Sequence, residues 1–235
     1  MHKIEMSPEI LDRIKGYRDG GHIFASIDPS RTAHIIVDLQ NGFMEPGATV
    51  ELPVAREIVP NVNAICAAVR EAGGLNVFIR YLIDDETLVS WSSWFTDFAS
   101  PERRKAMIDT FSRGCHGFAL WPGLDVQSDD LIVDKTRFGA FVPGSSKLHE
   151  MLQERGIDTL IITGTATNVC CESTARDAMQ MNYKIIFVSD GNAAMTDAEH
   201  NATLNNMVAL FADIMTTKEV VGVLGGAAAA KQAAE

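Results

Sequence analysis

The sequence has few cysteines and no long apolar run. Its 235 residues include 4 cysteines, two of them adjacent, and adjacent cysteines bridge only with strain, so no disulfide framework is expected. No stretch approaches the roughly 18 apolar residues that a membrane span needs. Residues 1–21 mix charges throughout and lack the apolar core of a signal peptide. We therefore expect a cytoplasmic protein with free thiols.

Basic residues are also scarce relative to acidic ones. The chain carries 20 Lys and Arg against 31 Asp and Glu, which gives a formal net charge of -11 at pH 7. A surface of that sign repels the phosphates of nucleic acids and anionic lipids. Neither nucleic acid nor a membrane is therefore an expected partner, and a small-molecule substrate remains.

Apolar runs rich in β-branched residues alternate with helical patterns along most of the chain. The runs are TAHIIVDL, LNVFIRYL, DLIVDK, TLIITGT and YKIIFVSD, with a weaker last run at DIMTT. Near-continuous apolar strands that alternate with helices indicate a parallel sheet covered on both faces. The sequence thus predicts a three-layer α/β fold.

The length fits one large domain. We place it at residues 31–224, after an N-terminal extension over 1–30 with one amphipathic helix and before a flexible tail over 225–235. Apolar residues recur at helical spacing between residues 59 and 74, so Cys66 is expected in the core. A long non-periodic, aromatic-rich region from Asp84 to about Pro122 is interpreted as a lid, an oligomer contact or both. Such a surface favours a homo-oligomer, a dimer or a tetramer.

Reactive side chains follow three of the predicted strands. The first run ends with Asp38, the third with Asp134 and Lys135, and the fourth leads into a loop and helix with Cys170 and Cys171. Ligands bind outside the carboxyl ends of parallel strands, so an acid, a base and a thiol converge on one edge. Taken singly, these residues are typical of a cap, a surface charge and a core position. Their coincidence favours a catalytic site.

Helical spacing separates the two adjacent cysteines. Cys171 shares an apolar stripe with Ala175 and Ala178, whereas the same spacing from Cys170 leads to polar residues. Cys171 is therefore assigned to the core. Cys170 is assigned to the first helical turn, where unpaired N–H groups and the helix dipole stabilise a thiolate.

These residue types suit acyl transfer. Lys135 would stabilise the Cys170 thiolate further, and Asp38 would take the thiol proton and return it to a leaving amine. Backbone N–H groups of the loop over 164–170 would bind the oxyanion of a tetrahedral intermediate. Such a site cleaves an activated carbonyl or an amide.

Three segments together resemble the isochorismatase-like cysteine hydrolase superfamily. They are IIVDLQNGF, DKTRFGAF and GTATNVCCESTARDA followed by DGNAA, in the family's order over roughly residues 32–217. The resemblance implies a Rossmann-like, six-stranded parallel sheet and a triad of Asp38, Lys135 and Cys170. It also implies a cis peptide between Thr165 and Ala166, with the N–H groups of Ala166 and Cys170 as the oxyanion hole.

The resemblance also suggests residues for the substrate pocket. Phe43 occupies the position at which the family packs an aromatic ring on the substrate, although a plain core Phe is the alternative. Arg80, Tyr81, Trp94 and Phe138 are further candidates. Arg80 would pair with a substrate carboxylate, unless it forms a structural ion pair.

Departures from the family pattern narrow the chemistry. Relatives that hydrolyse nicotinamide carry an Asp and His metal cluster after the second strand, whereas RYLIDDETLVSWSSW contains no His, so no metal or other cofactor is expected. Relatives that cleave the vinyl ether of isochorismate commonly lack the thiol, so Cys170 favours hydrolysis of a C–N bond. The segment TNVCCESTARDAM most resembles ureidoacrylate amidohydrolase, biuret hydrolase and N-carbamoylsarcosine amidase. We expect an amidohydrolase that forms a thioester on Cys170.

Three alternatives stay open. The first is vinyl ether hydrolysis with Asp38 as the acid and an incidental thiol. The second is a non-catalytic binding or oligomer-forming module, against which the intact triad argues. The third is a redox protein that uses Cys170 and Cys171 as a pair, although adjacent helical side chains point about 100° apart.

Overall fold

The computed structural model, which describes residues 1–16 and 21–232, contains one six-stranded sheet. Its strands are β1 (Thr32–Val37), β2 (Leu75–Tyr81), β3 (Leu131–Lys135), β4 (Thr159–Thr165), β5 (Lys184–Ala193) and β6 (Asp213–Met215). They lie in the order β3-β2-β1-β4-β5-β6, and every pairing is parallel. The predicted α/β fold is confirmed. Strand β5 extends beyond its apolar run and includes residues 191–193.

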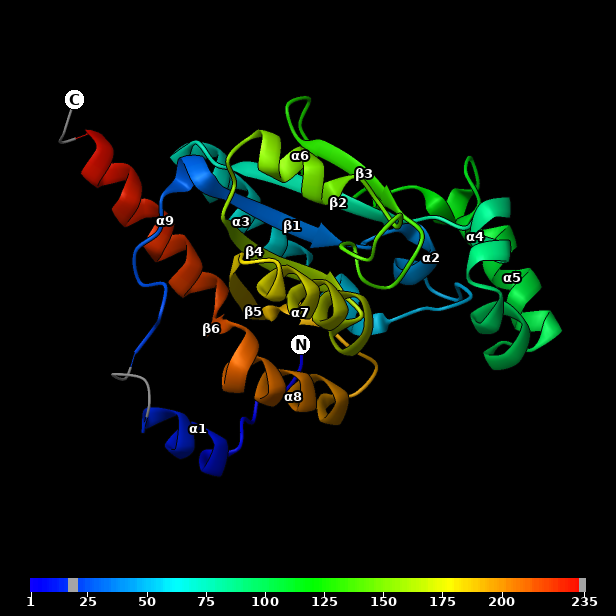
Figure 1. Ribbon diagram of the computed structural model, residues 1–235, viewed down its shortest axis with the longest axis horizontal. Helices are drawn as coiled ribbons and strands as arrows, with labels where there is room; N and C mark the ends of the chain where they lie inside the picture. Colours follow the sequence, from blue (N-terminus) through cyan, green and yellow to red (C-terminus); the bar gives the residue numbers. More distant parts are fainter. Residues whose placement is uncertain (17–20, 233–235) are drawn as a thin grey trace.

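Helices cover both faces of this sheet (Figure 1). One face is covered by α3 (Val59–Ala72) and α9 (Thr217–Gln232), and the other by α6 (Leu148–Glu154), α7 (Glu172–Gln180) and α8 (Asp197–Asn206). Cys66 is fully buried between α3 and the sheet, as its helical spacing predicts. None of the described helices is long and apolar enough to cross a lipid bilayer.

Helix α9 extends into the segment predicted as a flexible tail, and the flexibility of that segment stays a prediction. The helix continues through Gln232, so most of the segment predicted as a flexible tail is helical. The physical reason is its run of alanines, the residue with the highest intrinsic helix propensity, which offsets the cost of Gly225 and Gly226. Residues 233–235 of the predicted tail lie outside the described residues.

The predicted insertion is mostly helical. It forms α4 (Asp85–Ser90), a π-helical turn (Trp94–Phe98) and α5 (Pro101–Phe111), next to α2 (Asn41–Met44) at the carboxyl end of the sheet (Figure 1). The Asp84 carboxylate caps α4 by accepting from Thr87 N–H, and the Ser100 hydroxyl caps α5 by accepting from Arg103 N–H. These caps start helices whose apolar stripes are short, which is why the sequence shows no periodicity there, and the roles of lid and oligomer contact stay predictions.

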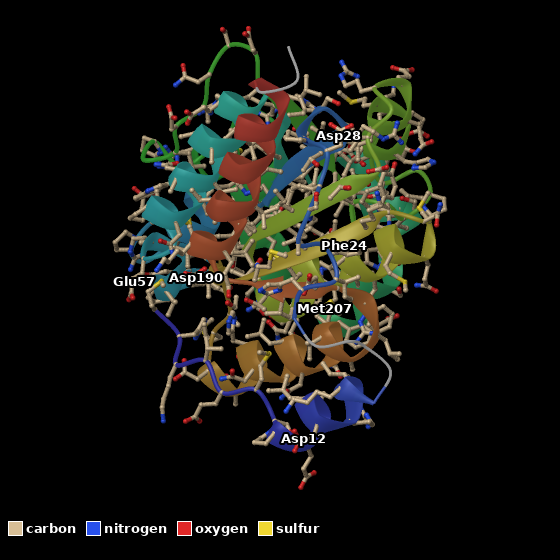
Figure 2. All side chains as sticks on the ribbon, turned by 90° about the vertical axis from the view of Figure 1, so that its left-hand side faces the viewer. Asp12, Phe24, Asp28, Glu57, Asp190 and Met207 are labelled. Carbon is tan, nitrogen blue, oxygen red and sulfur yellow. The ribbon has the colours of Figure 1, made fainter. Side chains whose placement is uncertain are left out.

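The N-terminal extension packs against the domain. Its helix α1 (Pro8–Lys15), predicted as amphipathic, lies beside α8 and Met207 (Figure 2). Ile14 is buried in the same core cluster as the sheet, and the Ser7 N–H donates to the Asn205 side chain at 2.8 Å. The division at residue 30 stays a prediction.

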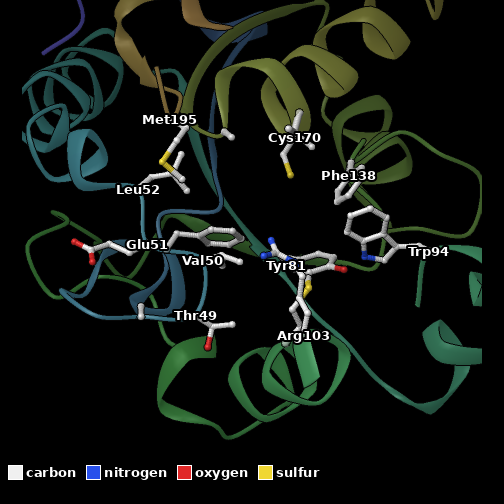
Figure 3. A pocket seen from close by; sticks show the side chains of 15 residues that line it. Thr49, Val50, Glu51, Leu52, Tyr81, Trp94, Arg103, Phe138, Cys170 and Met195 are labelled. Carbon is white, nitrogen blue, oxygen red and sulfur yellow. The ribbon is translucent and has the colours of Figure 1, made fainter. Parts of the chain in front are cut away.

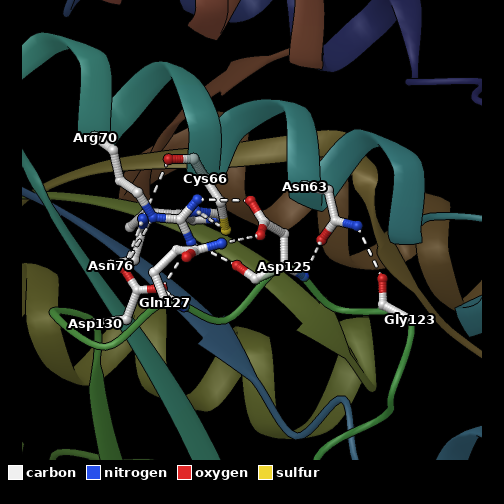
Figure 4. Close-up of polar contacts among 9 residues, drawn as sticks. Asn63, Cys66, Arg70, Asn76, Gly123, Asp125, Gln127 and Asp130 are labelled. Atoms are coloured by element: carbon white, nitrogen blue, oxygen red, sulfur yellow. Dashed lines mark hydrogen bonds and ion pairs between the residues drawn. The ribbon is translucent and has the colours of Figure 1, made fainter.

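A polar cluster fastens the segment before β3 to α3 (Figure 4). The Arg70 guanidinium forms ion pairs with Asp125 at 2.8 Å and with Asp130 at 2.6 Å. The Asp130 side chain is only 4% exposed, and it also accepts a hydrogen bond from Asn76 at 3.2 Å. Arg70 is thus the cation that compensates a buried carboxylate.

We expect Arg70→Met to lower the free energy of unfolding by about 2–3 kcal/mol, because it leaves the Asp130 carboxylate buried without its charged partner. Urea denaturation of both proteins measures the loss. The matched control is Arg155→Met, because the Arg155 side chain is exposed and donates only to the Met151 carbonyl. Equal losses in the two variants would contradict this role of Arg70.

Candidate active site

The strand order reverses direction next to β1, which pairs with β2 on one side and β4 on the other. Open α/β sheets bind ligands at such a switch point, beyond the carboxyl ends of the strands. β4 approaches β1 very closely there, because a Cβ on Gly164 would lie 2.1 Å from the Val37 carbonyl oxygen. Only glycine fits this position.

Asp38 follows β1 directly and is fully buried. Its φ angle is 54°, in the left-handed region that non-glycine residues rarely adopt and that clusters at functional sites. Its N–H donates to the Ile79 carbonyl at 3.0 Å, which fixes the backbone at the end of the sheet. The carboxylate is thereby held at the switch point.

Lys135 ends β3, whereas Asp38 follows β1, and β2 lies between these two strands. The Lys135 side chain therefore reaches Asp38 past the carboxyl end of β2. Its ammonium donates to Asp38 Oδ2 at 2.7 Å and to the Arg137 carbonyl at 3.0 Å, and both charged side chains are fully buried. Removing two charges from water costs more than such a pair commonly returns, so stability alone does not explain it. The other oxygen, Asp38 Oδ1, is buried without a hydrogen-bond partner.

The two cysteines follow β4 on a tight turn. The Thr165–Ala166 peptide is cis, and a π-helical turn (Thr167–Cys171) leads into α7. Ala166 begins this turn with no side-chain cap. Cys171 is fully buried in the core with Ala175 and Ala178, which confirms its assignment from helical spacing.

The sulfur of Cys170 faces a cavity (Figure 3). The residue is 5% exposed, and burial raises the pKa of its thiol, an effect that Lys135 opposes and Asp38 reinforces. Burial of the sulfur thus opposes the thiolate, whereas the nearby ammonium favours it as predicted, and the stabilised thiolate stays a prediction.

The same burial acts on the two partners. It raises the pKa of the Asp38 carboxyl, although Lys135 and Cys170 oppose the shift. For Lys135, burial lowers the pKa, but the charges of Asp38 and Cys170 outweigh it and the net shift is upward. The shift thus favours the charged ammonium of Lys135, and the raised pKa of Asp38 favours its protonated form relative to an ordinary Asp.

The cavity has a volume of about 420 Å³. Four of the five residues predicted for substrate binding line it, as does the predicted oxyanion residue: Phe43, Tyr81, Trp94, Phe138 and Ala166. Trp94 and Phe138 meet edge to face with ring centroids 5.1 Å apart, so the π-helical turn that begins at Trp94 and the loop after β3 form one aromatic wall. Most of the residues predicted for the substrate pocket therefore line this cavity.

Arg80 is the exception. It does not line the cavity; it forms an ion pair with Asp134 at 2.8 Å and stacks over the Phe118 ring at 4.4 Å. Successive strand residues point to opposite faces, so Tyr81 takes the inward position and Arg80 the outward one. The proposed carboxylate contact of Arg80 is corrected to the structural ion pair.

Several lining residues are not predicted from the sequence. Arg103 and Met107 enter from α5, residues 48–52 from the loop after α2, and Met195 from the loop before α8. The caps of α4 and α5 are the signal that could reveal helices over the site, but nothing local shows which helix face points inward. Among the described residues, no group of three or more His, Cys, Asp or Glu side chains could hold a metal ion.

Comparison with known proteins gives consistent matches. The isochorismatase domain family matches residues 32–219. The chain is 32% identical over 200 residues to the isochorismatase family protein YwoC of Bacillus subtilis, covering 83% of this chain and 94% of that protein. It is 29% identical over 215 residues to the ureidoacrylate amidohydrolase RutB of Caulobacter vibrioides, covering 85% and 93%.

A solved structure is similar as well. A cysteine hydrolase from Pseudomonas syringae pv. phaseolicola 1448A superimposes with a TM-score of 0.76 at 28% sequence identity. The similarity covers 89% of this chain and 100% of that one. It therefore includes the sheet, both helical layers and the switch point.

Proposed function

Because the chain belongs to the isochorismatase family of hydrolases, we propose that it is a cysteine-dependent amidohydrolase. It cleaves a C–N bond of a small amide, ureido or carbamoyl compound. The observation that carries this proposal is the buried Asp38–Lys135 ion pair beside a Cys170 thiol that faces an apolar-walled cavity. A nucleophile with an adjacent, oriented base is the arrangement that covalent catalysis requires.

In the first half-reaction, Asp38 takes the proton of the Cys170 thiol as the sulfur attacks the substrate carbonyl. The new C–S bond pushes an electron pair onto the carbonyl oxygen, and the N–H groups of Ala166 and Cys170 stabilise this oxyanion. Asp38 then gives its proton to the leaving nitrogen. The C–N bond breaks, ammonia or an amine departs, and a thioester remains on Cys170.

In the second half-reaction, Asp38 takes a proton from water, and the hydroxide attacks the thioester carbonyl. The C–S bond breaks, and the proton held on Asp38 returns to the sulfur. Lys135 remains an ammonium throughout, and its charge favours both the ionised Asp38 and the transient thiolate. The cycle consumes one water and needs no cofactor.

The likeness to RutB, whose name specifies ureidoacrylate, supports the ureido class. A panel of ureides, N-carbamoyl amino acids and simple amides, assayed for ammonia release, tests the proposal. Turnover of at least one compound, lost after alkylation with iodoacetamide, supports it. Ammonia release that survives full alkylation of Cys170 would contradict the thiol as the nucleophile, and turnover of a vinyl ether in place of every compound on the panel would favour hydrolysis with Asp38 as the acid.

We expect the acidic limb of the pH profile to follow Asp38. The base must be ionised, and burial raises the pKa of its carboxyl. We therefore expect kcat/KM to fall as the pH drops through the apparent pKa of Asp38, which lies above the ordinary Asp value of about 3.9. Because the three groups interact, this apparent pKa belongs to the triad as a whole. Steady-state kinetics between about pH 4 and pH 9 measure it. A profile that stays level down to about pH 4 would contradict the role of Asp38.

A further inference from the structure

Two charged side chains line the cavity, and one of them is already neutralised. Glu51 Oε1 accepts from the Arg56 guanidinium at 2.8 Å, and Oε2 accepts from the Gly47 N–H at 2.7 Å. Figure 3 shows its carboxylate turned away from the centre of the cavity. Glu51 therefore presents no free charge to a bound molecule.

Arg103 is the other charged residue. It projects from α5 into the cavity, from the wall opposite Cys170 (Figure 3). Within the described part of the chain its guanidinium has no hydrogen bond and no ion pair, whereas Arg56 and Arg70 each hold a carboxylate. Arg103 is exposed to solvent as well as lining the cavity, so its unpaired guanidinium lies where an entering anion meets it.

Two further donors point to the same ligand. Tyr81 is only 2% exposed, yet among the residues that the structure describes its hydroxyl has no hydrogen-bond partner, and the buried indole N–H of Trp94 has none either. Both residues line the cavity with Arg103. Burial raises the pKa of the Tyr81 hydroxyl, so it remains a proton donor. Buried polar groups left unpaired in the free protein indicate that the ligand completes their hydrogen bonds.

We propose that Arg103, with Tyr81 and Trp94, binds the carboxylate of the substrate, so that the preferred substrates are N-carbamoyl or ureido acids rather than neutral amides. A planar guanidinium presents two parallel N–H donors that match the two oxygens of a carboxylate. Anchored there, the ligand extends across the cavity toward Cys170. The identity of the anion as a substrate rests on the proposed function, but the anion site itself does not.

A pair of thiol reagents tests the anion site without any substrate. Iodoacetate and iodoacetamide alkylate the same sulfur and differ in carrying a carboxylate or an amide. We expect Arg103→Gln to lower the ratio of the iodoacetate rate to the iodoacetamide rate at Cys170 about fivefold or more, because the charge of Arg103 attracts only the negatively charged reagent into the cavity. Peptide mass spectrometry assigns the adduct to Cys170.

Lys105→Gln is the matched control. It removes the same charge from another exposed position on the same helix, but Lys105 is paired with Asp109 and does not line the cavity. Its rate ratio should stay within about twofold of the wild type, because its charge is paired and lies outside the cavity. Equal ratios in Arg103→Gln and the wild type, or equal decreases in both variants, would overturn the anion site.

Turnover then tests the substrate class. The ratio of kcat/KM for an N-carbamoyl acid to that for its neutral amide should fall about thirtyfold in Arg103→Gln, and Arg103→Lys should recover part of it. A wild type that favours the neutral compound would overturn the proposed specificity. If the alkylation ratio responds to Arg103 while no compound with a C–N bond is turned over, the anion site stands and the proposed amidohydrolase function fails.

Discussion

Replacement of Cys170 by Ser is expected to lower kcat/KM by about 10⁴-fold or more, whereas Cys171→Val should retain at least about a tenth of the wild-type value. The first change replaces the sulfur that faces the cavity by an oxygen that is harder to deprotonate and far less nucleophilic. The second keeps an apolar side chain of similar volume in the core, next to Ala175 and Ala178. We therefore expect activity to require the thiol of Cys170 and not that of Cys171.

The measurement is kcat/KM for the best compound of the ammonia-release panel. Circular dichroism and urea denaturation verify that both variants fold, and iodoacetamide labelling identifies the thiol that reacts in each. We expect one fast adduct, on Cys170, in the wild type and in Cys171→Val. The reverse ranking of the two variants, or two fast adducts in the wild type, would contradict Cys170 as the nucleophile and favour a role for the pair.

The sheet and the three residues at its edge could be predicted because they depend on local patterns. Apolar runs define buried parallel strands, and the residue that follows such a strand lies at the carboxyl edge whatever the rest of the fold does. Asp38 and Lys135 therefore meet at 2.7 Å, as expected from their positions alone. Helical spacing likewise separates Cys170 from Cys171.

The composition of the cavity could not be predicted in the same way. The sequence alone does not show which of Arg80 and Arg103 faces the cavity. Only the tertiary structure shows that Arg80 pairs with Asp134, whereas Arg103 lines the cavity and has no partner among the described residues. Phe111 of α5 packs against Phe43, which is distant in sequence, and this contact helps to orient the helix. Long-range packing decides which polar groups face a ligand.

The protonation state of Cys170 also depends on tertiary structure. The sequence shows a thiol near a helix start and a lysine, and both stabilise a thiolate. Depth of burial acts in the opposite direction, and it is set by the aromatic wall and the insertion, which the local pattern does not describe. The raised pKa of the thiol is the reason that the proposed mechanism assigns its deprotonation to Asp38.

The second large effect concerns Lys135. We expect Lys135→Met to lower kcat/KM by about 10³-fold or more, because the ammonium keeps Asp38 ionised and lowers the pKa of the Cys170 thiol relative to burial alone. Lys135→Arg should lose activity to a similar extent, since a planar guanidinium does not fit the place of a compact ammonium in a closed site. If turnover collapses while the pH dependence of Cys170 alkylation stays unchanged, Lys135 acts on the substrate or the transition state instead.

The same residue separates stability from function. Lys135→Met leaves the fully buried Asp38 carboxylate without its partner, so the free energy of unfolding should fall by about 3–5 kcal/mol. The double variant Asp38→Asn/Lys135→Met removes both charges and should regain at least about half of that loss while remaining inactive. The exposed pair of Lys184 and Asp158 is the control, because Lys184→Met should cost less than about 1 kcal/mol.

Burying the charges of Asp38 and Lys135 costs more free energy than burying an apolar pair would. A double variant that recovers stability without activity would therefore mean that the pair is retained for proton transfer to and from Cys170. A double variant no more stable than Lys135→Met would instead mean that the pair is structural.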